Sequence, residues 1–596
     1  MDHPTVALHH ARIVRKGAEA NIEDRSGGLG LAVNGRRTNR ARLEVGDQIS
    51  IGPFRILYDG SDFYERAPVG GLPVAAVGVR VDVDTGTILN PTTISLRPGE
   101  LVAIIGESGA GKSTLLKALA GVSQPSSGRI LVGGEDVMQR LPEIGYVPQF
   151  DIVHELLSVR EALDYAAQLR LPADTSQAER ESRVTEVIEQ LRLTERADVR
   201  VGRLSGGQRK RAAVGIEIMH KPGALFLDEP TTGLDPGLEK EMMLLFRSLA
   251  DAGQTVSLVT HATGSLSICD RAVVMGRGGH LLFDGKPGDL LTAFGIDSFD
   301  ALYEEFDRRS RAGLVGPQNG FALDEWGDLE LQAENGVKPP RKEVQQTLGY
   351  QTRVLTRRYA TLLRRDSKHL ASAFGQVPIL AMFCAFLFHM SVFDKQSDPN
   401  NPVPLSAGLA ALLVFMMVVI TVWLGSVNAA REVVKERLVT RREFAIGVQI
   451  PAYIASKLIV LFVFVTAQTL LFSLIVLVLR PPHETGAAIL GLVFVLVIGS
   501  CVSVLTGLLV SAASTIEDQA VGLIPLILVP QLLFAGAIVQ VAQIPTYLRW
   551  LTNFIPTRWS FAASGNALGM TDRISSDPQA AKATHYGNFF NTSAAA

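Results

Sequence analysis

The sequence predicts a multidomain protein with a small β domain, then an α/β domain, then an all-α polytopic membrane domain. Three observations lead to this prediction. Residues 1 to about 60 alternate apolar and polar positions between turn-forming residues, as short strands do. Between about 77 and 287, apolar strand-like runs alternate with helical stretches, which is typical of a largely parallel sheet. After residue 371, several runs lack charge over the roughly 20 residues that a membrane span needs.

The composition agrees with one polar part and one membrane part. Of the 596 residues, 47% are hydrophobic and 19% are charged. The formal net charge of −2 gives no general attraction to nucleic acid, and we expect no nucleic-acid partner. Cys269, Cys384 and Cys501 are widely spaced and form no metal-binding pattern. The first ten residues lack the features of a cleavable signal peptide, so the N-terminus is expected in the cytoplasm.

These patterns divide the chain into seven segments. We expect a partial β domain at 1–62, a linker at 63–76, the α/β domain at 77–295, a second linker at 296–349, an amphipathic interfacial helix at 350–370, a transmembrane domain at 371–560 and a polar tail at 561–596.

The segment 350–370 forms a basic amphipathic helix when it is placed at 100° per residue. Its basic stripe consists of Arg353, Arg357, Arg364 and Lys368, and its apolar stripe of Leu355, Tyr359, Leu362 and Leu363. Such a helix is suited to lying on an anionic membrane surface. A soluble helix with a solvated basic face is the alternative, and the apolar run that follows directly favours the membrane.

Five spans are predicted, at about 371–393, 405–427, 452–479, 486–511 and 519–543. The loop between the second and third spans carries five basic residues, Arg431, Lys435, Arg437, Arg441 and Arg442. The loops after the first and third spans hold only Lys395 and Arg480. By the positive-inside rule, the basic loop and the N-terminal domains are cytoplasmic in a multi-pass cell-membrane protein. None of the charged residues in the spans marks a convincing ion or proton path.

A glycine-rich segment, Gly106-Glu-Ser-Gly-Ala-Gly-Lys-Ser113, follows the apolar run 101–105 and precedes a helix-forming run. It fits the pattern G-x-x-x-x-G-K-S/T, whose backbone N–H groups surround phosphate oxygens. We expect Lys112 to reach the β- and γ-phosphates of ATP and Ser113 to ligate Mg²⁺. The predicted ATP contacts are Gly106, Glu107, Ser108, Gly109, Ala110, Gly111, Lys112, Ser113 and Thr114.

A second candidate element is the run Ala224-Leu-Phe-Leu-Asp-Glu-Pro230, where an apolar strand ends in two carboxylates. Ligands bind at this edge of open α/β sheets. We expect Asp228 to hold Mg²⁺, usually through water, and Glu229 to polarise the water that attacks the γ-phosphate. An ordinary acidic pair on the surface is the alternative, and the phosphate-binding segment upstream disfavours it.

Between these two elements stand Leu204, Ser205, Gly206, Gly207 and Gln208, and through this pentapeptide the sequence resembles the ATPases of ABC transporters. Gln149, Asp235 and His261 match further positions of that family in order. The resemblance implies that Gln149 senses Mg²⁺ and contacts the membrane domain. It also implies that His261 holds the γ-phosphate and that Asp235 lies at a dimer seam.

In that family the signature of one domain closes over the phosphate loop of another, so the resemblance implies a second copy of the chain as partner, with a heterodimer as the alternative. Many members stack adenine on an upstream aromatic residue, yet none lies between Tyr64 and Tyr146 here. The preference for ATP over GTP therefore stays open. The order of domains resembles the G subfamily, as do Arg431-Glu-Val-Val-Lys-Glu-Arg437 and Leu533-Phe-Ala-Gly536.

Residues 6–58 resemble the later two-thirds of a forkhead-associated (FHA) domain, a β-sandwich, through His10-Ala11, Asn34-Gly35 and the run from Gly46 to Gly52. Such domains read phosphothreonine, which makes a phosphothreonine protein a candidate partner. However, Ala7, Leu8, Gly27 and Leu29 replace the expected phosphate-reading residues, and phosphate dianions need arginine and hydroxyl donors. His10 and Asn34 are therefore interpreted as structural.

Three functions are compatible with these sequence features. The first is ATP-driven export of an amphipathic or lipid-like substrate, with membrane lipid as a further partner, because the spans hold few charges. The second is a membrane-anchored ATPase that acts as a signalling or scaffold module. The third is a truncated, non-transporting fragment, because the family pattern has six spans and earlier FHA strands.

Overall fold

The computed structural model describes residues 10–16, 19–25, 31–33, 36–51, 54–58, 60, 63–66, 71–84, 86–149, 153–173, 175–261, 263–296, 305, 308, 346–390, 392–393, 406–539, 541 and 544–576. Two compact units emerge from the internal contacts. Unit 1 comprises Met1–Val354 with Arg442–Val448, and unit 2 comprises Leu355–Arg441 with Gln449–Ala596. Ala7, Leu8, Gly27, Leu29 and Asn34, nearly all of the linker 296–349 and the tail after 576 lie outside the described residues.

The first part of unit 1 consists of two antiparallel sheets with a common core. One sheet has the order β1 (Ala11–Lys16), β2 (Glu19–Asp24) and β5 (Arg40–Leu43). The other has the order β4 (Arg36–Arg37), β3 (Ala32–Val33), β6 (Gln48–Ile51), β7 (Phe54–Tyr58) and β8 (Phe63–Arg66). Ile22 and Ile49 from the two sheets share one buried cluster. Strand β8 lies in the expected linker, because it continues the alternating pattern and pairs with β7.

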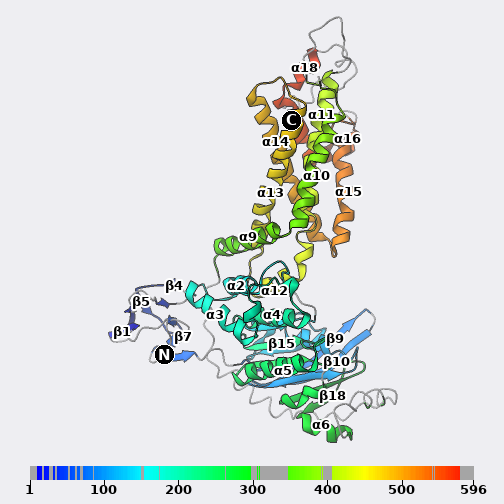
Figure 1. Cartoon of the computed structure of the whole chain (residues 1–596). Helices are drawn as coiled ribbons and strands as arrows, with labels where there is room; N and C mark the ends of the chain where they lie inside the picture. Colours follow the sequence, from blue (N-terminus) through cyan, green and yellow to red (C-terminus); the bar gives the residue numbers. More distant parts are fainter. Residues whose placement is uncertain are drawn as a thin grey trace. The chain divides into compact units, whose positions relative to one another are not determined.

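The α/β part of unit 1 is built on a six-stranded sheet (Figure 1). Its order is β14 (Ile144–Val147), β15 (Ala224–Asp228), β16 (Thr255–Val259), β11 (Leu101–Gly106), β17 (Arg271–Gly276) and β18 (His280–Gly285). All pairs are parallel except β17 with β18. The first five strands are buried throughout, as uninterrupted apolar runs predict for a sheet covered on both faces.

In the described part of this domain, between residues 74 and 294, a second sheet and six α-helices accompany the first sheet. The second sheet has the order β10 (Gly86–Leu96), β9 (Val74–Val83), β12 (Ser127–Val132) and β13 (Glu135–Asp136). The helices are α1 (Lys112–Leu119), α2 (Val159–Arg170), α3 (Gln177–Gln190), α4 (Gly206–Ile218), α5 (Pro236–Asp251) and α6 (Pro287–Phe294). Serine residues cap α2, α3 and α4 in capping boxes, which satisfy backbone donors of the first helical turn.

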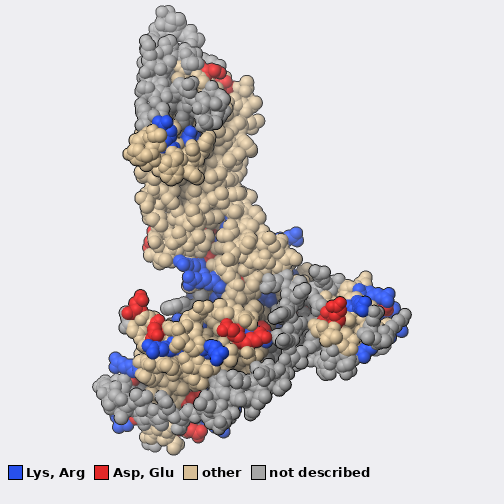
Figure 2. Space-filling view, turned by 180° about the vertical axis from the view of Figure 1, so that it is seen from behind, with Lys and Arg blue, Asp and Glu red and all other residues tan. Residues whose placement is uncertain are grey.

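Unit 2 is helical. Its elements are α10 (Ser367–Phe386), α11 (Ser406–Ala429), α13 (Ile450–Leu479), α14 (Gly486–Ala513), α15 (Glu517–Leu533), α16 (Thr546–Arg549), α17 (Pro556–Ala567) and α18 (Met570–Ser576). Within the described ranges, four segments are long and apolar enough to cross a membrane: Ser367–Phe386, Ala407–Ala445, Ile450–Leu479 and Gly486–Ala513. On the face of unit 2 in Figure 2, the described surface carries no charged side chain over a long stretch of the helices.

The fifth predicted span, 519–543, is not one continuous helix. Helix α15 has 17 residues, contains Pro525 and Pro530, and ends before Phe534. A proline inside a helix removes a backbone hydrogen bond and disturbs the preceding turn. The prediction from apolar composition was therefore wrong about the length of this helix, which ends at Leu533 and not near residue 543.

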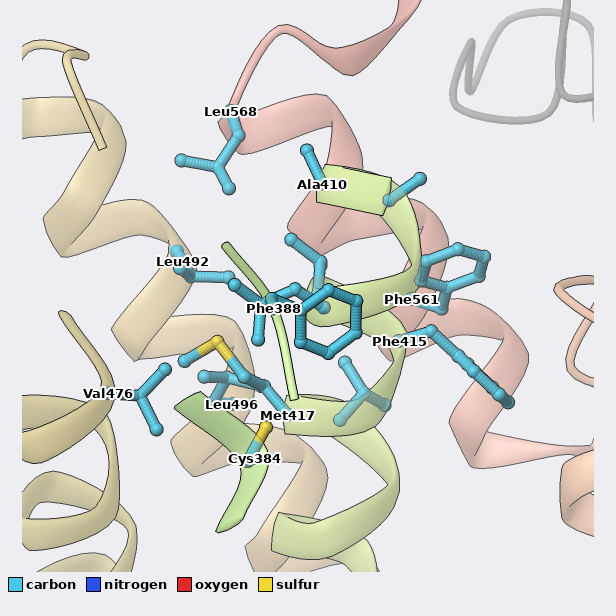
Figure 3. Close-up of a cluster of buried hydrophobic side chains, with 14 of the residues drawn as sticks. Cys384, Phe388, Ala410, Phe415, Met417, Val476, Leu492, Leu496, Phe561 and Leu568 are labelled. Carbon is cyan, nitrogen blue, oxygen red and sulfur yellow. The ribbon is translucent and has the colours of Figure 1, made fainter. Parts of the chain in front are cut away.

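The core of unit 2 extends beyond residue 560, where the polar tail was expected to begin. Phe561 of α17 is buried in the main apolar cluster together with Leu568, Met570 and Ile574. Its ring meets that of Phe415 edge to face, with centroids 5.3 Å apart (Figure 3). Residues 561–574 look polar overall because their apolar side chains are spaced to face one side of short helices.

Helices α11 and α14 approach each other closely through glycine. A Cβ added at Gly425 would lie 2.3 Å from the carbonyl oxygen of Ser500, and one at Gly507 would lie 2.4 Å from that of Ser426. Any larger side chain at these two positions would push the helices apart. Small residues are the usual contact of helices packed within a membrane.

Helix α9 (Leu348–Arg365) matches the predicted amphipathic helix. Arg353, Arg357 and Arg364 are exposed, whereas Leu355 and Tyr359 are buried. The helical period therefore placed the two faces of this segment correctly.

Candidate functional site

The phosphate loop joins strand β11 to helix α1. Gly106, Gly109 and Gly111 have φ angles of 147°, 80° and 81°, a region that side chains with a Cβ rarely enter. A Cβ at Gly106 would lie 2.0 Å from the carbonyl oxygen of Met275. The glycines therefore give the loop its curvature, and helix α1 begins directly after it, so that its N-terminus favours an anion in the loop.

The side chain of Lys112 lies along this loop. Its Nζ donates hydrogen bonds to the carbonyl oxygens of Gly106, at 2.9 Å, and Glu107, at 2.6 Å. Burial lowers the pKa of Lys112, while the carboxylates of Glu229 and Asp228 act in the opposite direction. The ammonium group is therefore hydrogen-bonded to the loop and lies within the electrostatic influence of the two acidic residues that the sequence singled out.

Ser113 and Asp228 are hydrogen-bonded to each other, although 115 positions of the sequence separate them. The Ser113 hydroxyl donates to Oδ1 of Asp228 at 2.7 Å. Asp228 ends strand β15, the second strand of the six-stranded sheet, and is 1% exposed. This arrangement places a hydroxyl and a carboxylate side by side at the mouth of the phosphate loop, as the parallel sheet predicts for residues at the carboxyl ends of its strands.

The carboxylate of Glu229 has three side-chain partners. Gln149 Nε2 donates to Oε2 at 3.0 Å, the Thr232 hydroxyl donates to the same oxygen at 3.0 Å, and His261 Nε2 lies 3.2 Å from Oε1. Glu229 itself has a φ angle of 49°, which costs energy for a residue other than glycine. The structure thus brings together the three residues predicted as catalytic.

Thr232 was missed in the sequence, although it lies only three residues after Glu229. A threonine near a strand end is too common to single out, and only the hydrogen bond identifies it. Lys210 was missed as well. It is buried in α4, and its Nζ donates to the carbonyl oxygen of Gln149 at 2.5 Å. This lysine connects helix α4 to the segment that carries Gln149.

The signature segment, residues 204–208, starts helix α4. Ser205 is the N-cap, and its Oγ accepts from the N–H of Gln208 at 3.3 Å while Gln208 Oε1 accepts from the N–H of Ser205 at 3.2 Å. A Cβ at Gly207 would lie 2.8 Å from Cδ2 of Leu234, so a larger residue there would force the Leu234 side chain to move. No hydrogen bond or ion pair between described residues joins this segment to the phosphate loop of the same chain.

Asp235 is also a helix cap. Its Oδ1 accepts from the N–H groups of Gly237, at 3.0 Å, and Leu238, at 3.1 Å, at the start of α5. Like Ser205, it is not joined to the group around Glu229 by any interaction between described residues. The predicted site residues therefore fall into two sets, one around the phosphate loop and one at the beginnings of α4 and α5.

A buried ionic group lies next to strand β14. Glu217 is 2% exposed, its Oε1 accepts from Arg170 Nη2 at 2.5 Å, and it also pairs with Arg442. Its Oε2 accepts from the backbone N–H of Tyr146 at 3.2 Å. Burial lowers the pKa of Arg170 to about 10 and raises the pKa of Tyr146. Sequence reasoning had no signal for this group, because its members come from four separate segments.

Unit 2 contains a charged residue that sequence reasoning passed over. Lys457 lies in α13 and is 1% exposed, with its Nζ 2.8 Å from Oε2 of Glu436 and 3.4 Å from Oε2 of Glu432. The same nitrogen lies 3.7 Å from the ring centroid of Tyr359. A buried charge needs such partners. The sequence did contain an indication of this site, because a lysine inside an apolar run needs a partner of opposite charge.

In the β domain, His10 is buried, with 5% of its surface exposed. Arg15 lies over the rings of Tyr58 and Phe63, 5.8 and 5.6 Å from their centroids. Cation–π contacts of this kind stabilise the packing of the two sheets.

Three family models match the chain. The FHA domain matches residues 1–52, the ABC transporter model residues 89–232 and the ABC-2 type transporter model residues 350–567. They follow the order in which the β domain, the α/β domain and the helical domain occur, and they confirm the three predicted resemblances.

Two of the relatives, Rv1747 and the G family member 18, agree with this. The ABC transporter ATP-binding/permease protein Rv1747 of Mycobacterium tuberculosis is 34% identical over 97% of this chain, which spans 67% of that protein's length. The ABC transporter G family member 18 of Arabidopsis thaliana is 37% identical over 42% of this chain and 35% of its own. A solved ATP binding subunit of an ABC transporter is 26% identical and covers 39% of this chain and 99% of its own, with a TM-score of 0.36.

The α/β domain is thus an ATP-hydrolysing domain and the helical domain belongs to a membrane protein. With an N-terminal FHA domain, an ATPase domain and an ABC-2 type membrane domain in one polypeptide, the chain belongs to the ABC transporter family.

Proposed function

We propose that the chain is a half-transporter that works as a dimer and uses ATP hydrolysis to export an amphipathic or lipid-like substrate. The observation that carries this proposal is the position of Glu229, whose carboxylate is held by Gln149, Thr232 and His261. A carboxylate fixed in this way beside a phosphate loop is suited to acting as a general base toward a water molecule.

In the proposed hydrolysis, Glu229 accepts a proton from the water that attacks the γ-phosphate. Lys112 neutralises charge on the β- and γ-phosphate oxygens, and His261 holds the γ-phosphate through its imidazole. Gln149 orients Glu229 until nucleotide is bound. Catalysis of phosphoryl transfer consists mostly of such positioning and charge stabilisation.

The residues at the mouth of the phosphate loop fit Mg²⁺. Ser113 Oγ and Asp228 Oδ1 are 2.7 Å apart, and Gln149 can offer its amide oxygen. Oxygen donors of this kind are the ligands that Mg²⁺ prefers. When bound, the ion would neutralise charge on the phosphate oxygens, with Ser113, Gln149 and Asp228 as its ligands, the last through water.

The dimer is proposed from the separation of the two sets of site residues. Ser205 and Gly207 make no hydrogen bond to the described phosphate loop of their own chain. We therefore expect them to contact the γ-phosphate bound by Lys112 of a second copy, which gives two equivalent sites in a symmetric dimer. A heterodimer with a related chain is the alternative.

The location is proposed as the cell membrane, with several spans and with the N-terminal domains in the cytoplasm. Four apolar helices and the five basic residues between α11 and α13 support this. The membrane-facing helices would contact lipid, and the scarcity of charge in the spans favours an amphipathic or lipid-like cargo.

Reconstitution tests this function directly. The full chain in lipid vesicles should move a fluorescent phospholipid analogue between leaflets when MgATP is added, and the Glu229→Gln variant in matched vesicles should not. Repeating the measurement with MgGTP in place of MgATP shows whether the protein prefers adenine or guanine nucleotides. Equal lipid movement by both proteins would exclude ATP-driven export of this cargo.

A membrane-anchored signalling module is the second candidate, because the chain begins with an FHA domain. In that case the vesicles would show ATP hydrolysis without lipid movement, and the full chain would bind a phosphothreonine peptide more tightly than the unphosphorylated peptide. Identical binding of both peptides would count against it.

A further inference from the structure

We infer that Tyr146 is a positioning residue that orients Asp228, and that Glu217 links Tyr146 to Arg442. These contacts form a coupling path that ends on the predicted metal-binding carboxylate. It rests on the proposal that Asp228 holds Mg²⁺.

The first step of the path is the contact between Tyr146 and Asp228. These residues lie on adjacent parallel strands, in which Tyr146 pairs with Phe226 and Val147 with Leu227. The Tyr146 hydroxyl lies 3.5 Å from Oδ2 of Asp228, while Ser113 donates to Oδ1. The two carboxylate oxygens therefore have different donors, and rotation of the carboxylate would break both contacts.

Both groups of this contact are buried. Tyr146 is 8% exposed and Asp228 is 1% exposed. A buried carboxylate gains more from each donor than an exposed one, since water cannot replace a lost partner. Loss of the Tyr146 hydroxyl would therefore leave Oδ2 free to turn away from the orientation that the metal needs.

The second step connects the backbone of Tyr146 to Arg442. Oε2 of Glu217 accepts a hydrogen bond from the N–H of Tyr146. Its Oε1 accepts a hydrogen bond from Arg170 and forms an ion pair with Arg442. Residues Arg442–Val448 belong to the same compact unit as these side chains. Because Glu217 is a buried charge, removal of Arg442 would change its position and with it the hydrogen bond to Tyr146.

This path differs from the contact made by Gln149. Gln149 reaches Glu229, the proposed base, and a change there affects the step that activates water. Tyr146 reaches Asp228, so a change at Arg442 would affect how firmly the metal is held. The segment that carries Arg442, α12 (Arg437–Ala445), would thus act on the metal site.

The affinity for Mn²⁺ tests this inference. Electron paramagnetic resonance on the full chain with a non-hydrolysable ATP analogue gives the Kd for Mn²⁺, a readout that does not depend on turnover. Tyr146→Phe should weaken Mn²⁺ binding about 3- to 10-fold, in line with the loss of one hydrogen bond to a charged group. Arg442→Gln should act in the same direction, and the double variant should be no weaker than the stronger single variant.

Controls separate this effect from a folding defect. Tyr58→Phe removes another buried tyrosine hydroxyl, which donates to the carbonyl oxygen of Gly60, and should leave the Kd for Mn²⁺ unchanged. Binding of the nucleotide analogue without metal should be equal in all variants.

An unchanged Kd in Tyr146→Phe would overturn the positioning role, and multiplied effects in the double variant would overturn the link to Arg442. If Asp228→Ala bound Mn²⁺ as tightly as the unchanged chain, the proposed metal site itself would be wrong. The two failures are therefore distinguishable.

Discussion

The side chain of Gln149 donates a hydrogen bond to the carboxylate of Glu229, with 3.0 Å between Nε2 and Oε2, although 80 positions separate the two residues. Both stand just beyond the carboxyl ends of neighbouring strands, β14 and β15. Their contact joins the segment that carries Gln149 to the proposed base.

Replacing Gln149 by alanine should lower kcat for ATP hydrolysis about 10-fold, because Glu229 loses a group that orients it. The Kd for ATP should stay within about twofold, since Lys112 and the phosphate loop carry binding. Phosphate release and nucleotide titration measure the two quantities. Gln168→Ala removes a glutamine that bonds Asp164 elsewhere in the domain and should change neither; an equal loss of kcat in both variants would contradict the assignment.

Thr232→Val should reduce kcat about 5- to 10-fold without changing the Kd for ATP, since it removes the hydroxyl donor to Oε2 of Glu229. Thr232→Ser keeps that donor and should restore most of the activity. Side-by-side measurements of kcat and KM check this. If serine rescued nothing, the methyl group rather than the hydroxyl would be the important part of Thr232.

Two inactive variants should complement each other if the active site forms between chains. Lys112→Ala inactivates the phosphate loop in both chains of a dimer, and Ser205→Arg inactivates the signature in both chains. Each variant alone should therefore lack activity. In a mixed dimer, one site pairs an unchanged loop with an unchanged signature. Co-expression with two affinity tags should therefore recover on the order of half the activity of the unchanged dimer, whereas no recovery would argue for sites within one chain.

Lys457→Met should destabilise the membrane domain by about 3–5 kcal/mol, because Glu432 and Glu436 would keep buried charges without their shared partner. Thermal unfolding in detergent, followed by fluorescence, measures the shift. Lys368→Met replaces an exposed lysine and should have little effect. Equal stability of both variants would show that the ion pairs of Lys457 contribute nothing.

His220 should make unit 1 sensitive to acid. Its ring nitrogens are buried and have no hydrogen-bond partner among the described residues, although part of the side chain reaches the surface. Burial, then Arg170 and Arg183, lower its pKa from 6.5 to about 3. Below pH 6.5 the unfolded chain binds a proton that the folded chain does not, so stability should fall between pH 6.5 and pH 3 by on the order of a few kcal/mol.

Chemical denaturation at several pH values checks this expectation. His220→Leu removes the group and should flatten the acid dependence over that range. His280→Leu leaves His220 in place and should keep the slope. The same slope in the unchanged chain and in His220→Leu would assign the acid sensitivity to other groups.

The sequence predicted most of the nucleotide site because its parts are local motifs. The loop from Gly106 to Ser113 and the pair after β15 each carry a recognisable pattern, and their order implied a parallel sheet that brings their ends together. Thr232, Lys210 and the Glu217 group were missed, because a single polar residue becomes informative only when its partner, distant in the chain, is known.

In the membrane domain, composition predicted apolar helices, and the four long ones formed. It did not predict that two prolines shorten the fifth helix, that residues after Phe561 join the core, or that Lys457 finds two carboxylates inside the protein. Hydropathy averages over a window, whereas these outcomes depend on individual side chains and on the helices that face them.

By itself, the sequence determined that this protein has an FHA-like β domain, an ABC ATPase domain and a helical membrane domain, and it identified Gln149, Glu229 and His261 as one site. Only the tertiary structure decided how the base is held and which residues approach Asp228. The physical reason is that a phosphate loop is encoded within eight successive residues, while the hydrogen bonds that orient Glu229 and Asp228 join strands whose neighbours in space are far apart in the chain.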